Sequence, residues 1–414
     1  MGTALACPAV PPADRTTEVL VVGAGPAGAA TATALARAGV DVLVVDKARF
    51  PREKICGDGL TTAALRELDA LGLDPAAVPS WIDIDDVVVR SPSGREVTFP
   101  LPRDGGRYGA VARRRDLDAA LVDLARRAGA TVVEGAALRT ARQGADGVHV
   151  EVDGVGRVDA RWAVGADGMW SPLRRSLGLA DPTYRGEWHA FRQYLTDVSP
   201  AASRELVVWF EPDLLPGYAW SFPVAGGVAN VGFGILRGSS YKVADMGSVW
   251  RELLARPHIR RFLGPDARPE SPHRAWPIPA RVDRTVLASG RTLFVGDAAA
   301  ATDPMTGEGI GQALATGRWA AEALLAHRSD PAAVRAAYEH EVGRDLVVDH
   351  RLAERLAGVL GHPAGARVAV RAAGLSGWTR RNFARWLFED YPRALVLTPG
   401  RWHRGMFTGP GAYR

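Results

Sequence analysis

The sequence predicts an α/β protein in which a parallel sheet carries an inserted antiparallel sheet and is followed by a helical C-terminal region. Three observations predict this class. A glycine-rich turn follows an apolar strand near residue 23, two later apolar strands also end in glycine and aspartate, and the stretch between those two strands alternates apolar and polar residues. Parallel strands buried on both faces are continuous apolar runs, whereas half-exposed antiparallel strands alternate.

The composition indicates a globular protein of two or three structural units. Its 414 residues are 47% hydrophobic and 23% charged. The two cysteines, Cys7 and Cys56, predict no disulfide framework and favour a reducing, cytoplasmic location. Residues 1–16 lack the basic start and apolar run of a signal peptide, so we expect a disordered leader. No uncharged apolar run reaches the ~18 residues that a bilayer-spanning helix needs.

Residues 18–46 carry the strongest local signal, because strand, turn, helix, strand and acid follow in register. The first glycine of a G-x-G-x-x-G turn permits the tight bend, the second lets the backbone approach a pyrophosphate, and the third lets helix pack on strand. An acid at the end of the second strand can accept hydrogen bonds from a ribose. The expected nucleotide contacts are Gly23, Gly25, Pro26, Ala27, Gly28 and Asp46.

A second segment, residues 291–326, predicts the other part of the same site. Its apolar strand ends in Gly296-Asp297, and a carboxylate there can reach the ribityl hydroxyls of a flavin. The stretch from Gly307 to Gly311 then begins a long helix, with Gly309 and Ile310 at its start. Helix starts offer free N–H groups and a positive dipole end, which suit the negative edge of a reduced flavin.

A third segment lies between these two. Residues 161–178 form an apolar strand that ends in Gly-Ala-Asp-Gly, with Asp167 as the acid. Upstream, residues 112–129 predict a helix with Asp116 as N-cap. Arg114 either reaches the cofactor's phosphates or adenine side, or is simply solvated. Leu138 completes the residues expected to bind the cofactor.

These three motifs together resemble the flavoprotein hydroxylase fold, of para-hydroxybenzoate-hydroxylase type, in which sequence-distant segments of a Rossmann-like domain bind one FAD. Within that superfamily, FPREKICGDGL (50–60) and LLPGYAWSFPVAGGVANVGFG (214–234) resemble the geranylgeranyl reductase family, which includes bacterial menaquinone reductases. The resemblance covers about residues 18–330, and no matching motif follows. It implies that FAD is the cofactor.

The resemblance also implies roles for the loop that begins at Cys56. The residues that wrap the isoalloxazine end of FAD are then Gly57, Asp58, Gly59 and Leu60, and Thr61 or Thr62 caps the next helix. A thiol beside a flavin could donate a proton, contact substrate, or pack as a small hydrophobe. All three alternatives stay open for Cys56.

The expected substrate side consists of a hairpin within residues 81–110 and an antiparallel sheet within residues 183–285. Aromatic residues are dense there, which fits a long apolar ligand, although an ordinary β core would look similar. The expected pocket residues are Tyr218, Trp220, Phe222, Arg192 and Tyr194. The candidate catalytic residues are Trp220, Tyr218 and Cys56.

The predicted FAD-binding domain comprises residues 17–80, 111–182 and 286–330, the substrate domain 81–110 and 183–285, and the helical C-terminal region 331–414. Residues 367–414 hold nine arginines against Glu389 and Asp390, a net charge of +7. Residues 377–405 therefore either contact an anionic membrane, peripherally at its inner face, or form an amphipathic helix packed on the protein. The nine histidines show no metal-ligand spacing, and no nucleic-acid module is recognised.

The favoured function is an FAD-dependent reductase that saturates carbon–carbon double bonds of a prenyl chain, of geranylgeranyl or isoprenoid-quinone type. No second nucleotide motif exists, so NAD(P)H would bind transiently, or a reduced protein carrier would donate electrons. The alternatives are a monooxygenase or halogenase of secondary metabolism on the same scaffold, and a flavin-binding protein without catalysis. The halogenase alternative is weakened by Tyr218 in place of a second tryptophan and by only three lysines, Lys47, Lys54 and Lys242.

Overall fold

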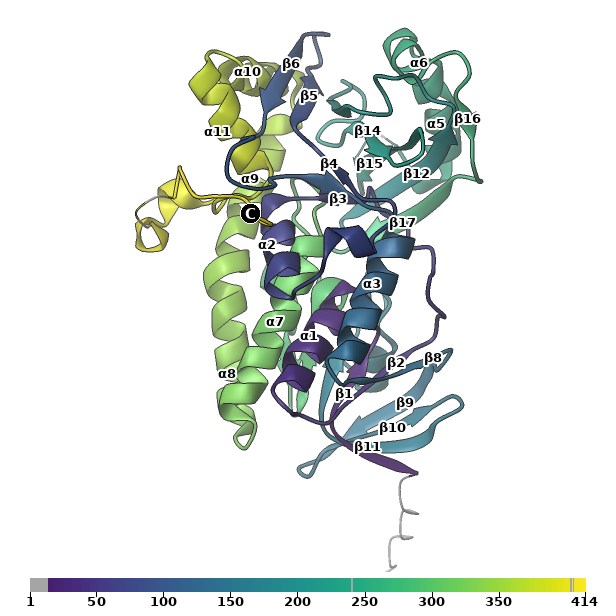
Figure 1. Cartoon of the computed structure of the whole chain (residues 1–414), viewed down its shortest axis with the longest axis vertical. Helices are drawn as coiled ribbons and strands as arrows, with labels where there is room; N and C mark the ends of the chain where they lie inside the picture. Colours follow the sequence, from purple (N-terminus) through teal and green to yellow (C-terminus); the bar gives the residue numbers. More distant parts are fainter. Residues whose placement is uncertain (1–13, 240, 403, 405) are drawn as a thin grey trace, which may run out of the picture.

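The computed structural model describes residues 14–239, 241–402, 404 and 406–414, and it confirms the predicted α/β class with an antiparallel sheet and C-terminal helices (Figure 1). The lower half of Figure 1 holds the parallel sheet and its helices, and the upper half holds the antiparallel sheet and the C-terminal helices. The substrate and cofactor residues predicted from the sequence converge where these halves meet.

The parallel sheet is built from apolar strands that carry the nucleotide motifs. Its strands β8, β2, β1, β11 and β19 lie side by side and parallel, in that order. Antiparallel strands extend the sheet through β10 and β9 on β11, and through β18 on β19. The bounds are β1 Arg15–Val22, β2 Val42–Asp46, β8 Thr131–Glu134, β9 Leu138–Gln143, β10 Val148–Val152, β11 Gly156–Gly165, β18 Ala288–Ser289 and β19 Thr292–Phe294.

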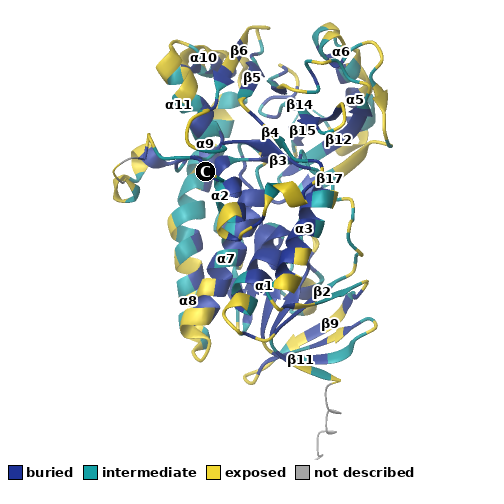
Figure 2. Ribbon diagram, in the orientation of Figure 1, coloured by how far each residue is buried: buried dark blue, intermediate teal, exposed yellow. Residues whose placement is uncertain are grey.

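Small side chains let helices pack tightly on this sheet. A Cβ at Gly28 would lie 1.9 Å from the carbonyl oxygen of Gly23, so only glycine allows the first helix to start this close to the strand. Thr31 Oγ1 donates to the carbonyl oxygen of Gly317 at 2.9 Å, which joins α1 to α7. The helices of this half are α1 Pro26–Arg37, α3 Arg114–Arg127, α4 Pro172–Ser176, α7 Ile310–His327 and α8 Pro331–Val342. Figure 2 shows α1 and α7 largely buried.

The antiparallel sheet has the order β16-β12-β15-β14-β13-β5-β6, with β17 also paired to β12. The predicted hairpin of residues 81–110 is present as β5 and β6, and β5 joins β13 in parallel. Two helices cover one face of the sheet through a cluster that includes Trp250 and Leu253. The bounds are β5 Asp86–Arg90, β6 Glu96–Pro100, β12 Trp188–Thr196, β13 Leu206–Trp209, β14 Ala219–Val224, β15 Val228–Leu236, β16 Arg268–Pro269, β17 Arg274–Ile278, α5 Met246–Ala255 and α6 Pro257–Leu263.

A three-stranded sheet connects the two halves. Its strands are β3 Gly59–Leu60, β7 Ala110–Val111 and β4 Ile82–Asp83, and α2 (Thr62–Ala70) follows β3. Thr61 caps α2 by accepting a hydrogen bond from the backbone N–H of Ala64 at 3.3 Å, as one of the two predicted alternatives has it. The loop that begins at Cys56 is thus held between a strand and a capped helix.

The C-terminal region folds back over the antiparallel sheet and α2. Its helices are α9 Val348–Leu360, α10 Pro363–Ala373 and α11 Gly377–Leu387, and a π-helical turn, Gly343–Val347, joins α8 to α9. Phe383 of α11 packs on Phe99 of β6, with ring centroids 4.7 Å apart. Just after α11, the carbonyl oxygen of Phe388 accepts a hydrogen bond from the backbone N–H of Thr62 at 2.8 Å. Residues far apart in sequence therefore meet at the start of α2.

Short helical turns complete the described chain. Their bounds are η1 Pro75–Ala77, η2 Val243–Asp245, η3 Val282–Arg284, η4 Gly296–Ala299, η6 Leu395–Leu397 and η7 Pro399–Arg401. None of the described helices is both long and apolar enough to cross a membrane.

Two local predictions were wrong. The first strand begins at Arg15, inside the leader predicted to extend through residue 16, because Arg15 and Thr16 already pair with Val158 and Asp159 of β11. Residues 1–13, including Cys7, lie outside the described part. Asp116 is not the N-cap of α3. That position belongs to Arg113, and Asp116 lies in the first turn, where its charge favours the helix dipole. The division into domains stays a prediction.

Candidate active site

A single large cavity lies between the two halves of the described structure. Its volume is about 810 Å³, and it begins at the carboxyl ends of β1, β2, β11 and β19, where doubly wound sheets bind their ligands. Nearly all the predicted cofactor residues line it, and Gly28 alone lies behind the wall. The lining residues predicted from the sequence are Gly23, Gly25, Pro26, Ala27, Asp46, Gly57, Asp58, Gly59, Leu60, Arg114, Leu138, Asp167, Gly296, Asp297, Gly309 and Ile310.

Two of the predicted acids use their oxygens to hold backbone in place. Asp46 accepts hydrogen bonds from the backbone N–H groups of Ala24 at 2.7 Å and Ala48 at 2.8 Å. Asp167 accepts from Ser171 Oγ at 2.6 Å and from the backbone N–H of Leu173 at 2.8 Å, which caps α4. Each carboxylate oxygen keeps a further lone pair, so these bonds position the acids at the wall without excluding a ligand.

Asp297 has a partner that the sequence did not reveal. Lys54 Nζ lies 3.8 Å from Asp297 Oδ2 and 4.1 Å from the centre of the Trp276 ring. Burial lowers the pKa of Lys54, and the Asp297 carboxylate opposes that shift. Two of the only three lysines, Lys47 and Lys54, thus line the cavity, so the scarcity of lysine loses weight as an argument against a halogenase.

Arg114 is buried, so the solvated alternative was wrong. Its guanidinium donates to both oxygens of Asp118, at 2.7 and 2.8 Å, within the same helix. Arg52 reaches the same carboxylate at 3.0 Å and lies beside Gly25 of the glycine turn. Arg52 Nη1 is buried without a hydrogen-bond partner among the described residues. A buried guanidinium donor beside the glycine turn fits the pyrophosphate of FAD, and sequence reasoning overlooked Arg52.

The loop at Cys56 is held from behind by Asp58. The Asp58 carboxylate is fully buried and accepts from Tyr194 Oη and from Asn230 Nδ2, the latter at 2.8 Å. Burial raises the pKa of Asp58 to about 6, although both hydrogen bonds oppose the shift. Burial also raises the pKa of the Cys56 thiol, which keeps it protonated.

Tyr194 and Arg192 do not line the cavity, so their prediction as pocket residues was wrong. Both are 2% exposed. The Arg192 guanidinium lies 4.1 Å from the centre of the Tyr194 ring and donates to Glu53 at 3.3 Å. Their strand places them behind the loop, where they support Asp58 rather than touch a ligand.

The aromatic residues at β14 do line the cavity, as predicted. Trp220 Nε1 donates to Asn230 Oδ1 at 3.2 Å, and Asn230 Nδ2 donates to the carbonyl oxygen of Cys56 at 2.8 Å. A Cβ at Gly232 would lie 2.4 Å from Trp220 Cζ2, so the absence of a side chain at this glycine leaves room for the indole. Asn230 and Gly232 therefore orient Trp220 against the loop at Cys56. Tyr218 and Phe222 stand on either side, with ring centroids 6.0 and 6.1 Å from that of Trp220.

The far end of the cavity is made by the C-terminal helices, which the sequence motifs did not indicate. The lining residues from α9, α10 and α11 and the residue after them are Leu356, Val359, Leu360, Ala366, Ala369, Val370, Phe383, Trp386, Leu387 and Phe388. All are apolar apart from the indole N–H of Trp386, which donates to the carbonyl oxygen of Arg393 at 3.2 Å. The packed-helix alternative for α11 is thus present on its inner face, while Trp378 is 67% exposed.

One group of side chains elsewhere in the described residues has metal-ligand types. His350 lies 3.4 Å from Asp283 and 3.5 Å from Glu354. Arg284 pairs with Glu354 at 2.5 Å, and Arg351 lies 4.0 Å from Asp283. These arginines supply the positive charge that a metal would bring, so we assign no metal to this group.

The fold and the cavity together define an FAD-binding flavoprotein. A glycine turn, acids at three strand ends, the Arg52 guanidinium and the start of α7 converge on one side of the cavity, and aromatic rings converge on the other. This is the donor set that FAD requires, with phosphate, ribityl and ring contacts from sequence-distant segments.

Comparisons with known proteins also indicate an FAD-binding flavoprotein. The family model described as "FAD binding domain" matches residues 16–342. A menaquinone reductase of Mycobacterium tuberculosis is 34% identical over 404 residues, covering 91% of this chain and 93% of the relative. A digeranylgeranylglycerophospholipid reductase of Methanopyrus kandleri is 35% identical, covering 74% of this chain and 76% of the relative. The chain belongs to the geranylgeranyl reductase family of FAD-dependent oxidoreductases.

A similarity over 91% of the chain cannot be confined to residues 18–330, so the relationship extends into the C-terminal region, beyond the motifs. The same fold is found in a geranylgeranyl bacteriochlorophyll reductase-like protein of Thermoplasma acidophilum. Its crystal structure has a TM-score of 0.76 and 22% identity, and covers 94% of this chain and 100% of that chain. A halogenase in complex with FAD has a TM-score of 0.69 and 19% identity, covering 92% of this chain and 84% of that chain, which shows a shared fold.

Proposed function

We propose that the protein saturates carbon–carbon double bonds of a prenyl chain, with FAD as its cofactor. The observation that carries this proposal is the continuity of the cavity. Its glycine-rich end suits FAD, and its other end is an apolar space closed by α9, α10 and α11, as a long hydrocarbon ligand requires. The reductase names of the relatives, which share 34–35% of their residues with this chain, support the same substrate class.

FAD, when bound, supplies two electrons as a hydride equivalent. The protein must then hold the alkene beside the cofactor, exclude water and provide a proton. Trp220 lies next to the loop at Cys56, and its aromatic face suits a positive charge that develops on the tertiary carbon of a trisubstituted alkene. Tyr218 Oη donates a hydrogen bond to the carbonyl oxygen of Thr306. This bond holds the cavity wall together between β14 and the start of α7.

The electrons come from NAD(P)H bound transiently or from a reduced protein carrier. Support for this proposal is limited to the sequence, which carries one G-x-G-x-x-G turn, and that turn is already used for FAD. Mixing oxidised protein with NADH, NADPH or a reduced ferredoxin without oxygen, and following loss of the flavin absorbance, identifies the donor.

The test of the function is an anaerobic incubation of reduced protein with isoprenoid quinones, geranylgeranyl phospholipids and free prenyl diphosphates. A prenyl reductase adds two hydrogen atoms to each double bond that it saturates, and mass spectrometry detects the resulting increase in mass. A monooxygenase or halogenase modifies its substrate only when oxygen is admitted, and a protein that merely binds flavin leaves every compound unchanged.

Replacing Asp297 with alanine is expected to weaken FAD binding. Charge-assisted hydrogen bonds contribute about 1.5–3 kcal/mol each, so the dissociation constant should rise about tenfold or more. The loss also leaves Lys54 without its carboxylate partner. Flavin retained after gel filtration, and fluorescence titration of the apoprotein with FAD, measure the effect.

Asp153→Ala is the matched control, because Asp153 is an exposed partner of Arg139 on the outer strands and lies away from the cavity lining. Its FAD affinity should equal that of the wild type. If Asp297→Ala also binds FAD with wild-type affinity, Asp297 does not contact the cofactor.

We further propose a peripheral contact between the C-terminal helices and an anionic membrane, which would bring the protein to its lipid substrate. Three apolar side chains on α10, α11 and the link between them are more than 60% exposed: Val368, Leu375 and Trp378. Exposed arginines surround them, namely Arg367, Arg371, Arg380 and Arg381. Apolar and cationic side chains mixed on one surface are typical of interfacial helices.

The double variant Leu375→Ser/Trp378→Ser is expected to sediment less with phosphatidylglycerol vesicles than the wild type, while keeping FAD. Exposed positions are chosen because Arg385 and Arg393 of the same region are buried in ion pairs and a truncation would open the cavity. Val286→Ser, at an exposed apolar residue of the FAD-binding half, is the control. Equal sedimentation of all three proteins would rule the contact out.

A further inference from the structure

We propose that Glu308 and Glu389 form an acid pair that stores one proton and that Glu308 donates it to the alkene carbon in the cavity. This inference rests on the proposed function, because it names the proton source for the saturation of a double bond. Glu308 stands inside the glycine stretch of residues 307–311 but was not among the residues expected to bind FAD, and Glu389 stands in the C-terminal region.

Glu308 lies in the loop before α7 and lines the cavity. Its Oε1 accepts a hydrogen bond from the backbone N–H of Gly311 at 2.7 Å, so one oxygen is anchored at the helix start and the other is left for a proton. The charge of Glu308 also acts on Cys56 and Tyr218, two residues of the same cavity wall. Glu308 is therefore placed beside the candidate substrate.

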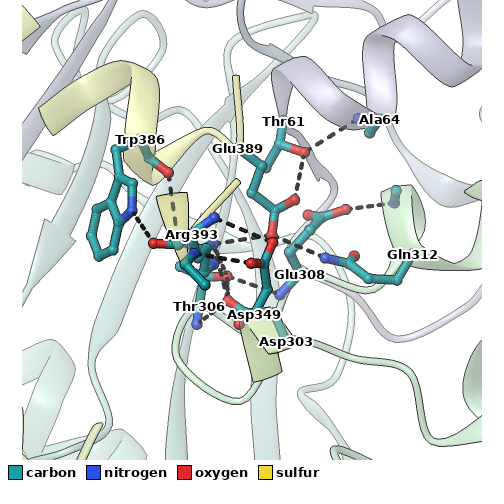
Figure 3. A network of polar contacts seen from close by, with 12 residues as sticks. Thr61, Ala64, Asp303, Thr306, Glu308, Gln312, Asp349, Trp386, Glu389 and Arg393 are labelled. Atoms are coloured by element: carbon teal, nitrogen blue, oxygen red, sulfur yellow. Dashed lines mark hydrogen bonds and ion pairs between the residues drawn. The ribbon is translucent and has the colours of Figure 1, made fainter. Parts of the chain in front are cut away.

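Glu389 follows α11 and reaches toward Glu308 from the opposite side (Figure 3). It accepts hydrogen bonds from Gln312 Nε2 at 3.0 Å, from Thr61 Oγ1 at 3.3 Å and from Arg393 Nη2 at 3.1 Å. These three donors come from α7, from the cap of α2 and from the C-terminal segment, so the pair lies where three segments distant in sequence meet.

The charges around the pair do not balance unless a proton is present. Arg393 is 4% exposed and lies 3.0 Å from Asp303 and 3.1 Å from Glu389. One guanidinium thus pairs with two carboxyl groups, those of Asp303 and Glu389, and the described residues give Glu308 no ion-pair partner. The nearby Asp349 is matched separately by Arg401 at 2.8 Å. Unpaired buried charge is costly, and protonation of one carboxyl removes part of it.

The hydrogen bonds of Gln312 also indicate a protonated carboxyl group in the pair. Gln312 Nε2 donates to Glu389, while its buried Oε1 has no donor within the described residues. Gln312 stands one helical turn after Glu308. In the reverse amide orientation Gln312 Oε1 lies 3.0 Å from Glu389 Oε1, and a protonated Glu389 is then the O–H donor that it lacks.

The electrostatic shifts agree with the geometry. Burial raises the pKa of Glu308 well above its ordinary value, and the Glu389 charge raises it further. Burial likewise raises the pKa of Glu389, against the attraction of Arg393. The two carboxyls therefore titrate as one unit with a shared proton. The titratable or charged groups that act on them are Cys56, Tyr218, Asp303, Asp349 and Arg393.

The proton transfer balances as follows. The alkene π pair forms a C–H bond to the proton of Glu308 at the less substituted carbon, and Glu308 is left as a carboxylate. Reduced FAD, when bound, would supply the hydride equivalent that neutralises the positive charge on the tertiary carbon and completes the saturated bond. Glu308 then regains a proton from Glu389, and Glu389 is reprotonated by water.

Infrared spectroscopy of the oxidised protein tests the pair without any turnover. The wild type is expected to show the carbonyl band of a protonated carboxylic acid near neutral pH, shifted in D2O and lost as the pH rises through the raised pKa values. Glu308→Gln and Glu389→Gln should each lack this band. Glu322→Gln, on the exposed side of α7, should keep it. A band that survives in both pair variants, or is absent from the wild type, would overturn the proposal.

A second measurement tests proton donation. Glu308→Gln is expected to slow prenyl saturation at least tenfold while the donor reduces its flavin at the wild-type rate. Saturation at the wild-type rate in Glu308→Gln would overturn the donor role. If the wild type saturates no prenyl compound, the proposed function fails, and the infrared band still decides whether the pair holds a proton. Flavin content and thermal unfolding of each variant confirm that it has folded.

Discussion

Replacing Arg393 with methionine is expected to lower the free energy of unfolding by about 3–5 kcal/mol, because removing one partner of a buried ion pair leaves the other charge uncompensated. Arg393 is 4% exposed and contacts both Asp303 and Glu389. Its guanidinium also lies 5.4 Å from the centre of the Trp386 ring, at the cavity wall. Denaturation of the FAD-saturated protein in urea measures the loss.

The sign of the pH dependence follows from the same contacts. Without Arg393, the buried carboxyls of the folded variant prefer to be protonated, so their folded-state pKa values lie above the unfolded ones. The stability deficit is therefore full at pH values above those raised pKa values and shrinks as the pH falls through them. Arg344→Met is the control, since Arg344 is half exposed and its ion-pair partners among the described residues, Glu341 and Asp345, are partly exposed; it should cost ~0–1 kcal/mol. A pH-independent deficit in Arg393→Met would contradict the ion-pair explanation.

Trp220→Leu is expected to slow prenyl saturation about tenfold or more, which corresponds to about 1.4 kcal/mol of transition-state free energy. An apolar cavity cannot solvate a positive charge on the tertiary carbon with water, and an indole face stabilises a desolvated cation by about 2 kcal/mol. Reduction of the flavin by the electron donor involves no such charge and should be little affected. Stopped-flow absorbance traces of the two half-reactions measure the rates separately.

Trp220→Phe is the matched control, because it keeps an aromatic face but loses the N–H that donates to Asn230. It should retain most of the activity if the aromatic face matters, and little if the hydrogen bond matters. Equal slowing of both half-reactions in Trp220→Leu would mean that Trp220 positions the loop at Cys56 and the flavin, and the role in stabilising a cation would be abandoned.

The local part of the site could be predicted from the sequence, because the residues that form each motif stand only a few positions apart. The glycine turn, the strand-end acids at residues 167 and 297, and the β14 aromatics all line the cavity. For Arg114 the solvated alternative was left open, although Asp118 stands one helical turn after it. Local spacing could have revealed that pair.

Tyr194 and Arg192 could not be placed without the register of the antiparallel sheet. Tyr194 pairs with Asn230 across β12 and β15, and both side chains reach Asp58 behind the loop. The sequence shows which residues of a strand are aromatic, but not which side chains of the neighbouring strands they contact. The contributions of Glu389 and Phe388 depend on contacts with residues 61 and 62, more than 300 positions away, for which no local pattern exists.

The cavity wall also has a consequence for the order in which the site is completed during synthesis. The segments that suit FAD are all present once Ile310 has been made, whereas the last apolar wall residue is Phe388. At roughly 5–20 residues per second, the 78 residues from 311 to 388 take about 4–16 s to synthesise. During that interval Trp220 and Phe222 have no partner from α9, α10 or α11. The emerging chain therefore has the means to bind flavin before it has an enclosed place for a hydrocarbon, and the cofactor is the earlier of the two ligands that the ribosome-bound protein can accept.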